Sequence, residues 1–114
     1  MTKAIFIRTS FASFHQWPEA PPQVAFLRNL HRHKFNVEVR FSVTEDDRQL
    51  EFFMTQAAVN KVLFEKVIPA LEKKRTMSCE MLAGLLFSLL EGLRLPVISV
   101  SIDEDGENGA IVSA

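Results

Sequence analysis

The sequence has little of what several large classes of protein require. A single cysteine, Cys79, excludes a disulfide within the chain and is typical of a protein of a reducing compartment. The net charge of -1 gives no electrostatic reason to bind nucleic acid or an anionic membrane surface. The most apolar window, Leu82 to Leu90, is far shorter than the roughly 20 residues of a membrane-spanning helix, and the apolar run after Met1 is too short for a signal peptide. We therefore expect a cytoplasmic protein that binds neither nucleic acid nor membrane.

The composition that remains is that of an ordinary globular protein. Apolar residues make up 47% of the chain and charged residues 24%. A chain of 114 residues has room for one hydrophobic core, so residues 1–114 are expected to form a single domain.

The most regular stretch of the sequence is a strict alternation of apolar and polar residues over about residues 31–43. This period of two predicts a half-buried antiparallel strand. The apolar set has the same parity as two histidines at the head of the run, so both imidazoles are expected to point to the core side of the sheet. These residues are His31, His33, Phe35, Val37, Val39, Phe41 and Val43.

The third histidine, His15, follows a strand expected over residues 3–14. A proline-containing loop over about residues 16–25 then separates it from His31 and His33. If the two strands pair as antiparallel neighbours, the loop brings His15 back to the other two. Three imidazole nitrogens with a fourth position open are the geometry of a catalytic or ligand-accepting zinc site. The alternative is that these histidines are simply packed or hydrogen-bonded, which is more common for a pair on a strand.

A first helix is expected over about residues 56–68, capped by Thr55. Leu50 to Phe53 precede it as a strand remnant or a tight helix entry. Pro69 should end or kink this helix, because proline lacks an amide donor and clashes with the preceding turn. Residues 69–75 are expected to form a further helical turn.

A second helix is expected over residues 79–91, with Ser78 as its cap and leucines at helical spacing along one face. Gly92 stands where a left-handed terminator is favoured. The segment from 95 to 102 is rich in β-formers, and two turn dipeptides between 105 and 109 precede a last strand at 110–112.

The order is thus β-β-α-α-β-β, which predicts an α+β fold with a four-stranded antiparallel sheet and two helices on one face. Such a sheet leaves two edges and one face uncovered, a liability that proteins commonly meet by association. We therefore expect a homo-oligomer.

Several motifs resemble those of the 6-pyruvoyl-tetrahydropterin synthase and 6-carboxytetrahydropterin synthase family. The Phe-Ala-Ser-Phe-His segment that ends at His15, and Leu30-His31-Arg32-His33, look like the zinc-binding histidine segments of that family. Residues 50–52 and 78–83 are similar to its Met-Asp-Phe and Thr-x-Glu-Asn-Leu-Ala elements, and Glu104 stands where the family has a glutamate that anchors the pterin. The resemblance implies a T-fold that assembles as a ring of shared sheets, often a hexamer. It also implies Zn²⁺ on His15, His31 and His33 and a pterin-like ring on Glu104, since a carboxylate can accept two parallel hydrogen bonds from a guanidine-type edge.

The chain departs from that family where the proton-transfer residues stand. Leu27 occupies the position of the proton-abstracting cysteine, and no histidine is left for the Asp-His element between the helices. A positioned base contributes roughly 10²–10⁴-fold to a rate, so the usual triphosphate elimination should be nearly lost. Glu51 and Glu80 are weak candidates for a substitute base, with water as a third.

Two further residues have open roles. Arg32 replaces a glycine between the paired histidines and points to the opposite face, where it either contacts a neighbouring subunit or is simply exposed. Cys79 begins the second helix, whose dipole would lower the thiol pKa, but a buried packing role is the better interpretation.

Three hypotheses for function follow. The first is a zinc enzyme that resembles the pterin synthases and acts on a dihydropterin or a related purine-derived metabolite, with diverged chemistry. The second is a non-catalytic module of the same fold that senses or sequesters a pterin or nucleotide. The third is a structural oligomer with a relict metal site.

Overall fold

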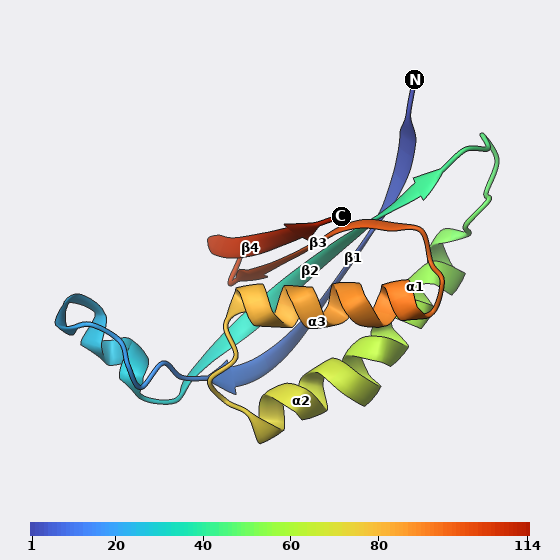
Figure 1. The fold of residues 1–114 in the computed structure, drawn as a ribbon. Helices are drawn as coiled ribbons and strands as arrows, with labels where there is room; N and C mark the ends of the chain where they lie inside the picture. The colour runs from blue at the N-terminus through green and yellow to red at the C-terminus, as the bar shows by residue number, and fades with distance from the viewer.

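The computed structural model describes residues 1–114 and contains one four-stranded antiparallel sheet. Its strands are β1 (Lys3–His15), β2 (His31–Val43), β3 (Val97–Glu104) and β4 (Asn108–Ser113), and they lie in the order β1-β2-β3-β4 (Figure 1). All helices of the covering layer fall between β2 and β3 in the chain. The predicted α+β class, with the order β-β-α-α-β-β, is confirmed.

The helices cover one face of the sheet (Figure 1). The first helical stretch consists of α1 (Phe52–Val62), a π-helical segment η2 (Leu63–Val67) and α2 (Ile68–Lys73), and it packs on β1. The second stretch, α3 (Cys79–Gly92), packs on β3 and β4. Between these helices and the sheet lies a core of 21 buried apolar residues, which includes Phe35, Val37, Val39 and Phe41 of β2. The alternation in β2 therefore sorts its side chains between the core and the uncovered face, as predicted.

The first helix begins earlier than predicted. Its cap is Glu51, whose carboxylate accepts hydrogen bonds from the backbone amides of Phe53 (2.6 Å) and Met54 (3.2 Å). Thr55 lies inside the first turn, where its hydroxyl donates to the Glu51 carbonyl at 2.7 Å. The expectation that Thr55 caps the helix is wrong because a carboxylate four residues earlier already satisfies the free amides.

Pro69 does not end the helical stretch, which runs on to Lys73. The π-helical segment lies directly before it, and the Ile68 amide bonds to the Leu63 carbonyl five residues back. A proline ring clashes with the carbonyl of an ordinary α-turn, and the wider π-turn accommodates that ring.

The second helix forms over the predicted range, with the Ser78 hydroxyl accepting from the Met81 amide at 3.2 Å. Gly92 is not the left-handed terminator, because it remains in α3 and Arg94 takes the positive φ of 62°. Only one of the two expected turn dipeptides is a turn. Asp105 and Gly106, with φ of 59° and 77°, join β3 to β4, whereas Asn108 and Gly109 begin β4.

The proline-containing connection from β1 to β2 is more regular than predicted. It contains a 3₁₀ segment, η1 (Pro22–Arg28), which begins with proline at a position where no backbone donor is required. None of the helices in the structure combines the length and the apolarity needed to cross a bilayer.

Candidate metal centre

The three histidines meet at one end of the β1–β2 pair. His15 lies directly opposite His31 in the strand register, and His33 follows two residues later on the same face of β2. The imidazole centroids are 4.6 Å (His15–His31), 4.9 Å (His31–His33) and 5.1 Å (His15–His33) apart. One nitrogen from each ring lies within 4.8 Å of the other two. The antiparallel pairing expected from the sequence thus brings all three imidazoles together.

Each imidazole has its Nδ1 atom against an oxygen that can only accept. The Nδ1 atoms of His15 and His31 lie 3.0 Å from the Met77 carbonyl and 2.8 Å from the Asn29 carbonyl. His33 Nδ1 lies 2.6 Å from a carboxylate oxygen of Asp105. Partners that can only accept favour a proton on every Nδ1, which leaves Nε2 of each ring as the atom that could bind a metal. Metal-bound histidines have this arrangement of outer partners, which fixes both the tautomer and the ring orientation.

The Nε2 atom of His33 indicates whether a cation fits among the three imidazoles. This atom is buried and has no hydrogen-bond partner, and no other buried side-chain nitrogen or oxygen in the chain is in this state. A buried polar atom without a partner costs about 1–3 kcal/mol. A divalent ion among the three Nε2 atoms would satisfy this nitrogen, so the residues present fit such an ion.

Glu104, at the end of β3, closes the cluster on its remaining side. Its Oε2 atom lies 2.9 Å from His15 Nε2 and 3.7 Å from His33 Nε2. No lysine or arginine forms an ion pair with this carboxylate. The side chain expected to hold a ligand ring therefore faces the histidines as well.

Cys79 lies in the wall of the same cavity as a buried free thiol. Burial, together with the charge of Glu104 and a hydrogen bond with it, raises the pKa of the Cys79 thiol to about 12. The expectation that the helix dipole lowers this pKa is wrong, because desolvation and a neighbouring carboxylate both oppose the thiolate. The interpretation of Cys79 as a buried packing residue agrees with the structure.

The cavity beside the histidines has a volume of about 430 Å³. Leu27, at the position of the family's catalytic cysteine, also lines this cavity. So does Glu80, one of the two candidates for a substitute base. The cavity wall consists of His15, Gln16, Trp17, Leu27, His31, Thr76, Met77, Ser78, Cys79, Glu80, Met81, Glu104, Asn108 and Gly109.

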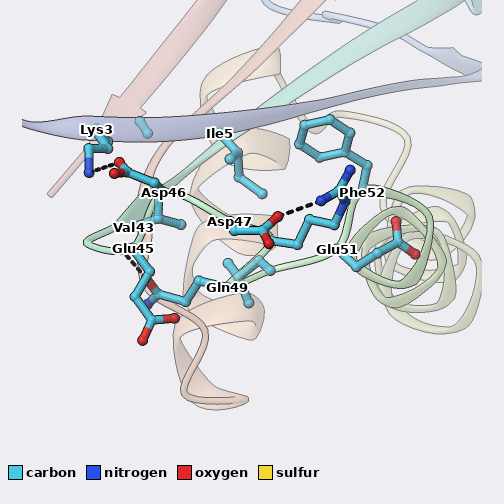
Figure 2. A pocket seen from close by; sticks show the side chains of 12 residues that line it. Lys3, Ile5, Val43, Glu45, Asp46, Asp47, Gln49, Glu51 and Phe52 are labelled. Carbon is cyan, nitrogen blue, oxygen red and sulfur yellow. Dashed lines mark hydrogen bonds and ion pairs between the residues drawn. The ribbon is translucent and has the colours of Figure 1, made fainter.

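Glu51 lies elsewhere in the chain. It caps α1 and lines a second cavity at the other end of the hairpin, where Lys3 pairs with Val43 (Figure 2). Within one chain it is therefore remote from the histidines. Arg32 pairs with Phe14 on the uncovered face of the sheet and is exposed.

Asp105 is the residue of the site that sequence reasoning missed. Besides its contact with His33, its other carboxylate oxygen accepts from the Lys34 amide at 2.8 Å. The bond with His33 and the Lys34 amide together lower the pKa of Asp105. The turn is fixed because Asp103 accepts from both the Asn36 side chain and the Gly106 amide, each at 2.8 Å. The Asp-Gly dipeptide marked a turn, but only the β2–β3 register could place that turn beside His33.

No protein-family model and no curated protein sequence matches this chain. Among solved structures, the chain is similar to a crystal structure described as that of uncharacterized protein WS1659 from Wolinella succinogenes, with a TM-score of 0.65 and 16% sequence identity. The similarity covers 99% of this chain and 98% of that one. At this identity, the likeness defines a shared fold along the whole chain.

Proposed function

We propose that this protein binds zinc through His15, His31 and His33 and acts on a dihydropterin or a related purine-derived metabolite. The resemblance to the 6-pyruvoyl-tetrahydropterin and 6-carboxytetrahydropterin synthases implies both parts of this proposal. The observation that carries the proposal is the convergence of three imidazoles, each with Nδ1 held by an acceptor. A bound zinc ion supplies Lewis acidity that polarises an oxygen of the ligand.

The cavity beside the cluster supports a ring-shaped ligand of modest size. Its volume of about 430 Å³ falls in the range of small-molecule sites, roughly 300–1,000 Å³. Glu104 reaches this cavity from β3 and could accept two parallel hydrogen bonds from the guanidine-type edge of a pterin. Trp17 and Met81 offer apolar surface in the same wall.

The chemistry proposed is not the standard elimination. Leu27 lines the cavity but cannot carry a proton, and the raised pKa of Cys79 keeps that thiol neutral. Among the acidic candidates for a base, Glu80 lines this cavity and Glu51 does not. These observations favour either a diverged reaction in which Glu80 or water accepts the proton, or the second hypothesis, a non-catalytic protein that binds a pterin or nucleotide. A relict site is the weaker interpretation, because the outer partners of all three histidines are in place.

The test has two parts. Zinc bound per chain is measured by mass spectrometry, and the zinc-loaded protein is then incubated with dihydroneopterin triphosphate and the small molecules are analysed. Turnover would support the enzyme, and retention of unchanged ligand at one equivalent per chain would support the binding protein. Failure to bind zinc would overturn the proposal, while zinc binding without turnover or retention would leave only the relict site.

We also propose that the chain works as a cytoplasmic homo-oligomer, with a hexamer or another ring of shared sheets as the arrangement implied by the resemblance. The outer edges of β1 and β4 have no strand partner within the chain. On the uncovered face, the side chains of Phe6, Phe14 and Ile111 are 52%, 41% and 73% exposed. Light scattering coupled to size-exclusion chromatography measures the oligomer, and a monomer at micromolar concentration would overturn this part.

A further inference from the structure

We infer that Glu104 is a fourth ligand of the metal centre in the ligand-free protein. The inference rests on the proposed zinc site and changes its character, because a site of three histidines and one carboxylate has no open position. It also departs from the role of Glu104 as a ring anchor alone.

The first argument is the spacing of Glu104 Oε2 from the histidine nitrogens. In a tetrahedral site with bonds of about 2.0–2.1 Å, any two ligand atoms lie about 3.3–3.4 Å apart. The distances from Oε2 to the Nε2 atoms of His15 and His33 are 2.9 Å and 3.7 Å, on either side of that value. The oxygen thus lies beside two of the three nitrogens. Neither Glu104 oxygen has a comparable contact with His31, so the carboxylate or the His31 ring would have to shift for all four groups to reach one ion.

The second argument is the balance of donors and acceptors around His15. Its Nδ1 atom faces the Met77 carbonyl and its Nε2 atom faces the Glu104 carboxylate, and neither oxygen can donate a hydrogen bond. With Nδ1 donating to the Met77 carbonyl, the contact between Nε2 and Oε2 needs a cation, either a second ring proton or a metal ion. A metal ion between Nε2 and Oε2 meets this need while Nδ1 keeps its proton.

The third argument concerns the charge of Glu104. Its side chain is 30% exposed, and the groups within ion-pair distance are His15 and His33, which carry a positive charge only when protonated. A partly buried carboxylate without a lysine or arginine partner is costly unless another cation neutralises it. Zinc would provide that charge at the position to which Oε2 already points.

A consequence for ligand binding follows. A metabolite with its own oxygen donor would have to displace Glu104 from the metal, and the released carboxylate would then be free to accept from the ring edge. The two roles of Glu104 would therefore alternate between the free and the bound protein.

The experiment compares the wild type with Glu104→Gln, using zinc and cobalt as the probes. Zinc affinity is measured by competition with a chromophoric chelator. Outer partners of a metal ligand contribute 10–100-fold to affinity, so loss of a direct ligand should weaken zinc binding at least about tenfold. The visible absorption of the Co²⁺-loaded protein should also change in this variant. Two matched controls are Glu107→Gln, which removes the same charge from the exposed turn, and Glu80→Gln, which removes it from the cavity wall.

Equal affinity and equal Co²⁺ spectra for wild type and Glu104→Gln would overturn the inference while leaving the zinc site intact. An equal loss in Glu80→Gln would also overturn it, because the effect would then be the charge of the cavity and not ligation. Azide offers a second readout, because this small anion must displace Glu104 from a closed site but not from the site of Glu104→Gln. It should therefore alter the Co²⁺ spectrum of Glu104→Gln at a lower concentration than that of the wild type, and an equal response of the two proteins would overturn the inference. A wild type that binds neither metal would instead overturn the proposed function.

Discussion

The two ends of the β1–β2 hairpin each carry a cavity whose wall includes charged side chains, and the two cavities have similar volumes, about 430 Å³ beside the histidines and about 460 Å³ at the opposite end. At the opposite end, five of the six charged side chains in the cavity wall already have partners, and the sixth, Glu45, is exposed to solvent. Lys3 pairs with Asp46, Arg48 pairs with Asp47, and the Glu51 carboxylate caps α1 (Figure 2).

At the histidine end, by contrast, some polar atoms lack a suitable hydrogen-bond partner. His33 Nε2 has no partner, and His15 has an acceptor at each ring nitrogen. Buried polar atoms in native proteins are almost always satisfied, and the proposed cation would remove this exception. The two cavities have similar volumes, but they differ in whether the polar atoms of their walls have hydrogen-bond partners.

The largest effect should come from His33→Ala. Removing a direct ligand should reduce zinc affinity by more than about 100-fold, because outer partners alone are worth 10–100-fold. Chelator competition measures this change. Asp47→Asn at the opposite cavity is the matched control and should bind zinc like the wild type. If the two variants lost affinity equally, the distinction between the two ends would fail.

Asp105→Ala should have the next largest effect. The change removes the acceptor that holds the Nδ1 proton of His33, and we expect zinc affinity to fall about 10–100-fold. Asp105 also accepts from the Lys34 amide, so the unfolding transition must be recorded for the metal-free variant. A variant with normal zinc affinity and lowered stability would reduce Asp105 to a turn residue.

At the opposite end, Glu51→Ala should affect stability and not metal. Losing the cap of α1 should lower the free energy of unfolding by about 1 kcal/mol, a typical value for a helix cap. Urea denaturation measures this loss. A loss of zinc affinity comparable to that of Asp105→Ala would show that Glu51 reaches a metal centre after all, as it could across a subunit boundary.

The smallest effect is expected midway along the hairpin, at Glu38. Burial alone would raise the pKa of Glu38, but hydrogen bonds and charge interactions with Arg8 and Arg40 outweigh it and hold the pKa below 4.5. A lowered carboxyl pKa adds stability above the unfolded pKa that is lost as the pH falls through the folded value. Compared with Glu38→Gln, the wild type should be about 0.2–1 kcal/mol more stable at neutral pH, and this difference should shrink below pH 4.5. A difference that is constant with pH would contradict the assignment.

The strands and the second helix could be predicted because local patterns determine them. The alternation of apolar and polar residues predicted both ends of β2. The spacing of the leucines, together with Ser78 as a cap, predicted the range of α3. The parity of His31 and His33 also gave their common face. These signals are periodic and repeat several times, so one exception does not erase them.

The predictions that failed depended on a single residue. Thr55 and Gly92 have suitable side chains for their expected roles, but Glu51 and Arg94 take those roles in the structure. At Pro69, where the sequence predicts an end or a kink followed by a further helical turn, the chain stays helical to Lys73 through a π-turn that proline itself does not signal. Asp105 and the Met77 carbonyl reach the histidines across 72 and 62 residues of chain, and only tertiary structure brings such groups together.

The register that sets His15 opposite His31 has a consequence for how the hairpin closes. Strand side chains alternate with a period of two, so a slip of one residue would send His15 to the other face and separate it from its partners. A metal ion that needs all three imidazoles would bind only the correctly paired strands, acting as a reversible cross-link over the connection between residues 16 and 30. At a free concentration 100 times its Kd it would favour that alignment by about 2.7 kcal/mol. Zinc would then help select the native hairpin while the chain folds.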